Sequence, residues 1–166
     1  VAGCGCFDIQ AAGIDIYNWV RAYTDFSEDS VGTRLRGGYS FGNYSNISAY
    51  YTFQNARIYD LADDASEYLQ SQAGRSNLSA ITTILERDST DHPFLPTRGS
   101  INLGSVMFAS PGMGSDSEFV KSELKSGWYI PLFWKFTGFV KGSAGWINET
   151  ASKPAPIYER FFLGGI

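Results

Sequence analysis

The stretch Val31–Phe41, VGTRLRGGYSF, alternates between apolar and polar side chains along most of its length. A period of two residues is that of a β-strand with one apolar and one polar face. The odd-numbered positions supply Val31, Thr33, Leu35, Tyr39 and Phe41, and the even-numbered positions supply Gly32, Arg34, Arg36, Gly38 and Ser40. The stretch therefore predicts a long amphipathic strand.

Six further stretches predict strands. The same period recurs clearly in Ile47–Gln54, Val120–Ile130 and Trp134–Trp146, and less regularly in Ile14–Thr24, Leu78–Arg87 and Ile101–Ser110. The phase slips around Asn18, Ile84 lies out of phase, and the last of these stretches has apolar residues on both faces. A β-bulge or a locally filled interior would each explain these irregularities.

The connections between the strands differ in kind. Polar segments follow the first, third, fifth and seventh strands, at Asp25–Ser30, Asp60–Ser76, Pro111–Ser117 and from Asn148 onward. Tight links follow the second and sixth strands, at Gly42–Ser45 and Pro131–Phe133, and Ser89–Arg98 is of moderate length. The segment Asp60–Ser76 contains a candidate short helix. Long strands joined in this way predict an all-β chain, an antiparallel meander of about seven strands from a transmembrane β-barrel.

Composition supports a surface that does not all face water. Only 18% of the residues are charged, whereas soluble domains average about 25%, and 16% are aromatic. Tyr and Trp gather near the predicted strand ends, as in the aromatic girdles of membrane barrels. No apolar run approaches the ~20 residues of a membrane-spanning helix. A soluble lipocalin-like binding barrel remains the alternative, because alternation alone does not say which face points inward.

If the strands form a membrane barrel, the alternation predicts which side chains face lipid and which face the lumen. Charged side chains are costly on the lipid face, so the alternate positions that carry polar side chains are expected to face the barrel lumen. The predicted lumen-facing residues are Arg34, Arg36, Lys121, Glu123, Lys125, Lys135 and Lys141. The predicted lipid-facing residues are Leu35, Phe53, Leu124, Trp128, Phe136 and Val140.

No motif for covalent chemistry stands out. His92 is the single histidine, and no nucleophile elbow, phosphate loop or dinucleotide fingerprint accompanies it. Cys4 and Cys6 are too few for a structural zinc site and too close for an unstrained disulfide. A net charge of −4 gives no electrostatic footprint for nucleic acid. The sequence predicts neither an enzyme nor a site for a metal or cofactor.

Two motifs carry a resemblance to a known family. The segment PIYERFFLGG, with Tyr158, Glu159, Arg160, Phe161, Leu163, Gly164 and Gly165, resembles the run that leads into the in-folding loop of the BamA family of outer-membrane protein assembly factors. The turn residues Pro96, Thr97, Arg98 and Gly99 are similar to the family's Pro-Thr-Arg-Gly turn, with Arg87–Ser89 upstream. Tyr17–Trp19 is similar to a strand segment of some bacterial members. The resemblance runs from about Phe7 to the end of the chain.

The resemblance implies an interior part of a sixteen-stranded barrel in the bacterial outer membrane. Residues 1–166 would form a partial barrel domain, with a poorly matched start at 1–10 and the beginning of the in-folding loop at 149–166. The family's Arg-Gly-Phe loop element and its POTRA domains have no counterpart in the sequence. The chain is therefore expected to be a fragment.

The function that the resemblance implies is insertion and folding of other β-barrel proteins. Its partners would be outer-membrane lipids and unfolded barrel clients, with accessory lipoproteins as further candidates and no nucleic acid. The alternatives are a related barrel that exports polypeptides and a small outer-membrane pore or adhesin. The lipocalin-like soluble barrel is the remaining alternative.

Overall fold

The computed structural model describes residues 11–22, 27–61, 70, 73–134, 136–150 and 154–161. The expectations for Cys4, Cys6, Lys135, Leu163, Gly164 and Gly165 lie outside these residues. The candidate helix within Asp60–Ser76 falls on a stretch where, between residues 62 and 72, Gln70 alone is described. No helix among the described residues has the length and apolar character needed to cross a membrane.

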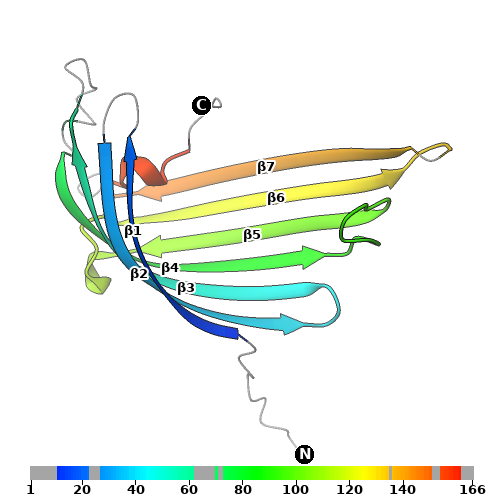
Figure 1. Cartoon of the computed structure of the whole chain (residues 1–166), viewed down its shortest axis with the longest axis horizontal. Coiled ribbons are helices and arrows are strands. Elements are labelled where there is room, and N and C mark those ends of the chain that lie inside the picture. The colour runs from blue at the N-terminus through cyan, green and yellow to red at the C-terminus, as the bar shows by residue number, and fades with distance from the viewer. Residues whose placement is uncertain are drawn as a thin grey trace, which may run out of the picture.

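The described chain is one antiparallel meander, which confirms the predicted fold class (Figure 1). Its strands are β1 (Ala11–Ala22), β2 (Ser27–Phe41), β3 (Ser45–Tyr59), β4 (Gly74–Asp88), β5 (Gly99–Ala109), β6 (Phe119–Pro131) and β7 (Thr137–Glu149). Two 3-10 turns, η1 (Pro111–Met113) and η2 (Ile157–Glu159), complete the description. Each strand pairs with its neighbours in sequence, so β1 and β7 are the two edges of the described sheet.

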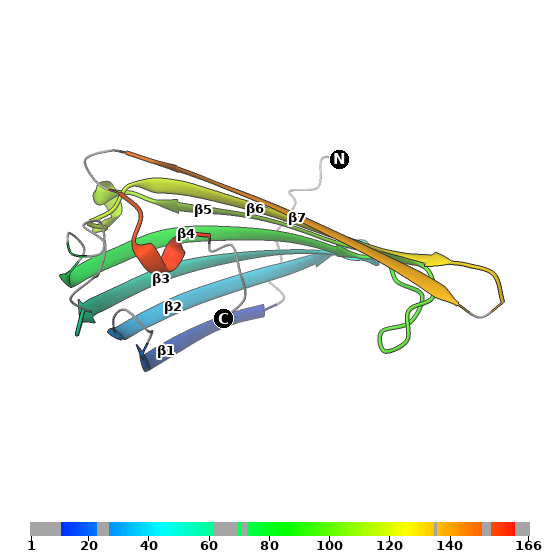
Figure 2. The ribbon, with the colours of Figure 1, turned by 90° about the horizontal axis from the view of Figure 1, so that it is seen from above.

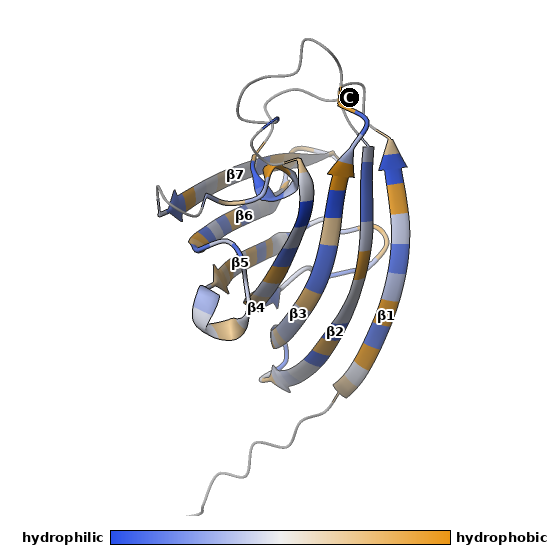
Figure 3. Ribbon diagram, turned by 90° about the vertical axis from the view of Figure 1, so that its left-hand side faces the viewer, coloured by the Kyte–Doolittle hydropathy of each residue, from blue (hydrophilic) through white to orange (hydrophobic). Residues whose placement is uncertain are grey.

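The strands are long enough to cross a bilayer. They run from 11 residues in β5 to 15 in β2, and about 9–11 tilted residues suffice for a transmembrane strand. Residues directly opposite each other in an antiparallel pair lie on the same face. The register therefore divides every strand between two faces of the sheet, and apolar and polar residues alternate along β1 and β3 (Figure 3).

The irregular phases do not come from bulges, and those at Ile84 and in β5 come from a filled interior. Pairing runs without a break through Asn18, which lies opposite Val31, and through Ile84, which lies between Ser48 and Ser105. Ile84 shares its face with Leu78 and with Met107 of β5. Elsewhere this face of the sheet carries polar residues. It is apolar around Ile84 because another part of the chain covers it there.

Several predicted strand boundaries are wrong, and the clearest cases are the start of β2 and the start of β7. Asp25–Ser30 was expected to be a polar connection, but β2 begins at Ser27, where Glu28 and Ser30 are fully buried polar residues of the strand. The connection is consequently short, and the long-loop end of the meander is less uniform than predicted. Trp134 and Phe136 were expected in the last strand, yet both belong to the β6–β7 link, where Trp134 adopts a φ of 60°.

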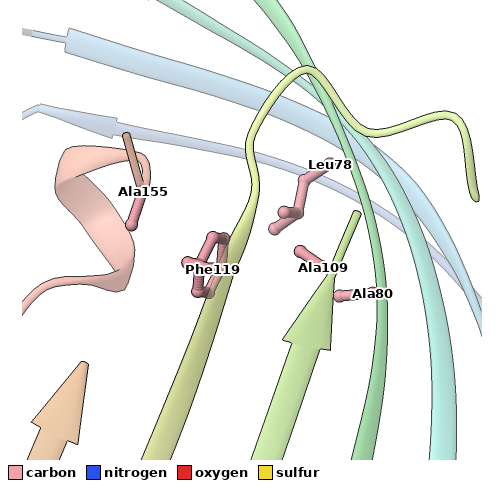
Figure 4. Close-up of a cluster of buried hydrophobic side chains, with 5 residues drawn as sticks. All are labelled: Leu78, Ala80, Ala109, Phe119 and Ala155. Atoms are coloured by element: carbon pink, nitrogen blue, oxygen red, sulfur yellow. The ribbon is translucent and has the colours of Figure 1, made fainter. Parts of the chain in front are cut away.

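The sheet curves from β1 to β7, and η2 lies on its inner side (Figure 2). A small core is found there, formed by Leu78 and Ala80 of β4, Ala109 of β5, Phe119 of β6, and Ala155 (Figure 4). Met107, Ile147 and Tyr158 pack against this cluster. The core thus joins the chain that follows β7 to the concave face.

Candidate functional site

The chain that follows β7 lies against the concave face of the sheet. We call residues 154–161 the C-terminal segment. Its Glu159 borders a cavity of about 290 Å³ together with Arg34 of β2, and its Oε2 atom accepts a hydrogen bond from Lys121 Nζ of β6 at 3.0 Å. Strands β2 and β6 are four steps apart, about 19 Å in a flat sheet. Glu159 can pair with β6 and line a cavity beside β2 because the sheet curves around it.

Glu149, the last residue of β7, anchors the C-terminal segment at a second point. Its Oε2 atom accepts a hydrogen bond from the backbone N–H of Ala155 at 2.9 Å, and its Oε1 atom pairs with the Arg160 guanidinium. A carboxylate that binds both a backbone N–H and a guanidinium makes charge-assisted hydrogen bonds, which are stronger than neutral ones. Glu149 therefore folds the chain back over the sheet directly after the strand ends.

Phe161 extends the contact along β7. Its ring lies against Gly145, where an added Cβ would clash with the Cζ and Cε atoms of the ring, and Lys121 Nζ is 5.1 Å from the ring centroid. The missing side chain at Gly145 is what lets the ring approach the strand. The ammonium of Lys121 thus contacts both the Glu159 carboxylate and the face of an aromatic ring.

Tyr158 is the aromatic residue by which the segment contacts the small core. It packs against the core cluster, and burial together with the nearby Glu159 and Glu28 carboxylates raises the pKa of its phenol well above the usual value. A phenol with a raised pKa keeps its proton at neutral pH and can act as a hydrogen-bond donor.

The register places the predicted lumen-facing residues together. Arg34, Arg36, Lys121, Glu123, Lys125 and Lys141 all lie on the concave face, the face that carries the C-terminal segment. Leu35, Phe53, Leu124, Trp128 and Val140 lie on the convex face. That convex face leaves large apolar side chains exposed, including Leu124 at 65% and Val140 at 61%. Phe136 is 61% exposed, but in the β6–β7 link.

Several residues of the site were missed from the sequence. Glu28, Ser30, Gln54 and Glu149 all contribute to the concave face, and Glu149 is central to the fold-back. Glu28 and Ser30 are at even-numbered positions, like Arg34 and Arg36 of the same strand. This shared alternation was the signal that could have identified them. Their low hydropathy led to a loop assignment instead.

The predicted turn motif is a compact structure at the opposite end of the sheet. Asp91 accepts hydrogen bonds from Thr97 N at 2.8 Å, Thr97 Oγ1 at 2.5 Å and Arg98 N at 3.1 Å. These bonds lower the pKa of the Asp91 carboxyl, and the bond from the Thr97 hydroxyl has the largest effect. Asp91 was not predicted, although it organises the residues that were.

We expect Asp91→Asn to loosen this turn in a pH-dependent way. Because the folded-state pKa of Asp91 is lowered, its stabilising effect is full above the unfolded pKa of about 3.9 and is lost as the pH falls toward the folded value. Urea unfolding of the full-length protein should show a gap between wild type and variant at pH 7 that narrows below about pH 4. Asp60→Asn, at an exposed carboxylate at the other end of the sheet, is the control and should show no such narrowing.

We expect Glu159→Gln to release the C-terminal segment from the sheet. The side chains of Glu159 and Lys121 are 23% and 22% exposed. The free energy that holds the segment on the sheet should therefore fall by about 1–2 kcal/mol, between the values for a surface ion pair and a buried one. Ala155 is fully buried, so the rate of maleimide labelling of Ala155→Cys reports release. Labelling should rise ~5- to 30-fold. Glu123→Gln, which breaks a local pair with Lys125, should leave the rate unchanged.

Comparisons with known proteins agree with this architecture. A family model described as the Omp85 superfamily domain matches residues 9–166. The chain is similar to the outer membrane protein assembly factor BamA of Nitratidesulfovibrio vulgaris strain Hildenborough, with 28% identity over 154 residues that cover 93% of this chain and 20% of the relative. It is also similar to the outer membrane protein assembly factor BamA of Neorickettsia risticii strain Illinois, with 31% identity over 105 residues that cover 63% of this chain and 14% of the relative. The chain spans about a fifth or less of these relatives.

Proposed function

The chain belongs to the Omp85 superfamily, and we propose that it is part of a factor that inserts and folds β-barrel proteins in the bacterial outer membrane. The observation that carries the proposal is a meander with an exposed apolar convex face and a polar concave face that holds a segment of the same chain. Unfolded barrel proteins are the proposed clients. Accessory lipoproteins are further candidate partners.

The two faces of the sheet support a barrel wall in lipid. We propose that the convex face contacts lipid and that the concave face lines the lumen, with Lys135 following the parity of Lys141. In hydrocarbon a backbone polar group without a partner costs several kcal/mol, so the edges at β1 and β7 require further strands. The remaining strands of a larger barrel would supply these partners.

The C-terminal segment supports the in-folding loop that the sequence motif predicts. Its contacts with β6 and β7 direct the chain into the concavity, and Leu163, Gly164 and Gly165 follow it in sequence. In this proposal the segment fixes where the loop starts. The protein then acts by offering a membrane surface and strand edges with which a client strand can pair, and it carries out no covalent chemistry.

The test uses the full-length protein that contains this chain, reconstituted into liposomes. A urea-unfolded outer-membrane barrel is added, and the fraction that acquires heat-modifiable electrophoretic mobility is followed over time. We expect faster folding than in liposomes that hold the same amount of an unrelated porin. Equal rates in the two preparations would refute the insertion function. Appearance of a soluble polypeptide inside the vesicles would instead indicate an exporting barrel.

A further inference from the structure

A chain of buried and partly buried hydrogen bonds crosses three strands of the concave face. Tyr17 of β1 donates to Gln54 Oε1 of β3 at 2.9 Å, and Gln54 Nε2 donates to Ser30 Oγ of β2 at 3.0 Å. Ser30 Oγ in turn donates to Glu28 Oε1 at 3.0 Å. Every donor points toward Glu28, so this chain of bonds ends at the Glu28 carboxylate.

The second oxygen of that carboxylate is the unusual feature. Glu28 is fully buried, and its Oε2 atom has no hydrogen-bond partner among the described residues. A buried carboxylate oxygen without a donor is strongly disfavoured. Arg21 lies opposite Glu28 in the register, but its guanidinium is over the Trp19 ring at 4.2 Å. The network therefore lacks its last donor.

Tyr158 of the C-terminal segment offers that donor. Its hydroxyl is also buried and also without a hydrogen-bond partner among the described residues. Tyr158 packs against the core cluster that includes Leu78, and Leu78 lies directly opposite Gln54 of the network, on the concave face that also carries Glu28. The Glu28 carboxylate also contributes to the raised pKa of the phenol. A protonated hydroxyl and a bare carboxylate oxygen are complementary, and a short approach or one bridging water would satisfy both.

We propose that Tyr158 is a positioning residue whose hydroxyl donates a hydrogen bond to Glu28 Oε2, directly or through one water molecule. This bond ties the C-terminal segment to β2. The ion pairs of Glu159 and Arg160 tie it to β6 and β7, so the segment is held from both sides of the concavity. The proposal concerns the position of the segment and does not depend on the proposed insertion function.

The experiment uses the full-length protein with its native cysteines replaced by serine and with the Ala155→Cys reporter. Tyr158→Phe removes one oxygen atom, and Glu28→Met removes both acceptor oxygens at similar length. We expect each to accelerate maleimide labelling about tenfold or more, as for loss of a hydrogen bond to a charged group. The double variant should label no faster than the single variants. Glu28→Gln can still pair its amide with the hydroxyl and should give a smaller increase.

Matched controls carry the same chemical changes elsewhere on the concave face. Tyr129→Phe, where the ring stacks on Phe139, and Glu123→Gln should leave the labelling rate within twofold of the reference. An unchanged rate in Tyr158→Phe would overturn the proposal. Effects of Tyr158→Phe and Glu28→Met that multiply in the double variant would overturn it as well, because they would then be independent. If Glu28→Met does not fold, the same comparison is made with Glu28→Leu, which also lacks both acceptor oxygens.

Discussion

Leu124→Arg should prevent or strongly destabilise assembly of the barrel wall in membranes. Leu124 lies near the middle of β6 on the convex face and is 65% exposed. An Arg on the lipid face near the bilayer midplane costs about 2–4 kcal/mol. We expect the ratio of folded to unfolded full-length protein to fall ~30- to 1000-fold. Heat-modifiable mobility after refolding into liposomes measures this ratio.

The matched control places the same side chain on the other face of the neighbouring strand. Ser105 of β5 lies on the concave face directly opposite Glu123 of β6. Ser105→Arg adds a cation beside a carboxylate, so we expect a change within about 0.5 kcal/mol. If Ser105→Arg were the more damaging substitution, the assignment of the convex face to lipid would be wrong.

The fold follows from the sequence wherever one face of a strand is apolar throughout. Leu35, Phe53, Leu124 and Val140 all occupy the face that alternation predicts. The pattern failed where polar residues belong to a strand, as at Glu28 and Ser30. A polar residue that faces a lumen and one in a loop look the same in a single sequence, and the choice depends on pairing with a distant strand.

Only some residues of the site, and none of its contacts, were predictable from the sequence. The motif around Glu159 and Arg160 identified the C-terminal segment, yet their partners Lys121 and Glu149 lie 38 and 11 residues earlier in the chain. Periodicity places Lys121 on a face but does not say which part of the chain meets it there. The apolar Ile84 among polar positions, and the apolar residues on both faces of Ile101–Ser110, were the early signs that the concave face is partly covered.

The turn between β4 and β5 shows how one residue can be required by backbone geometry alone. Gly99 has a φ of 109°, a conformation that residues with a side chain rarely adopt. A Cβ built there would lie 2.7 Å from Thr90 Cα and closer still to the carbonyl oxygen of Ser89. The opposing backbone is held in place, because Ser89 N–H donates to Ser100 O at 2.9 Å and Asp91 accepts from Thr97 and Arg98.

Gly99→Ala should therefore destabilise the full-length protein by about 2–5 kcal/mol, since it combines an unfavourable φ with a clash against fixed backbone. Urea unfolding measures the loss. Gly42→Ala separates the two causes, because Gly42 has a φ of 62° but open space around its Cβ position, and should cost about 1 kcal/mol. Gly37→Ala, with open space and no left-handed φ, should be near neutral. If Gly99→Ala were no worse than Gly42→Ala, the close approach of the two backbones would not constrain this turn.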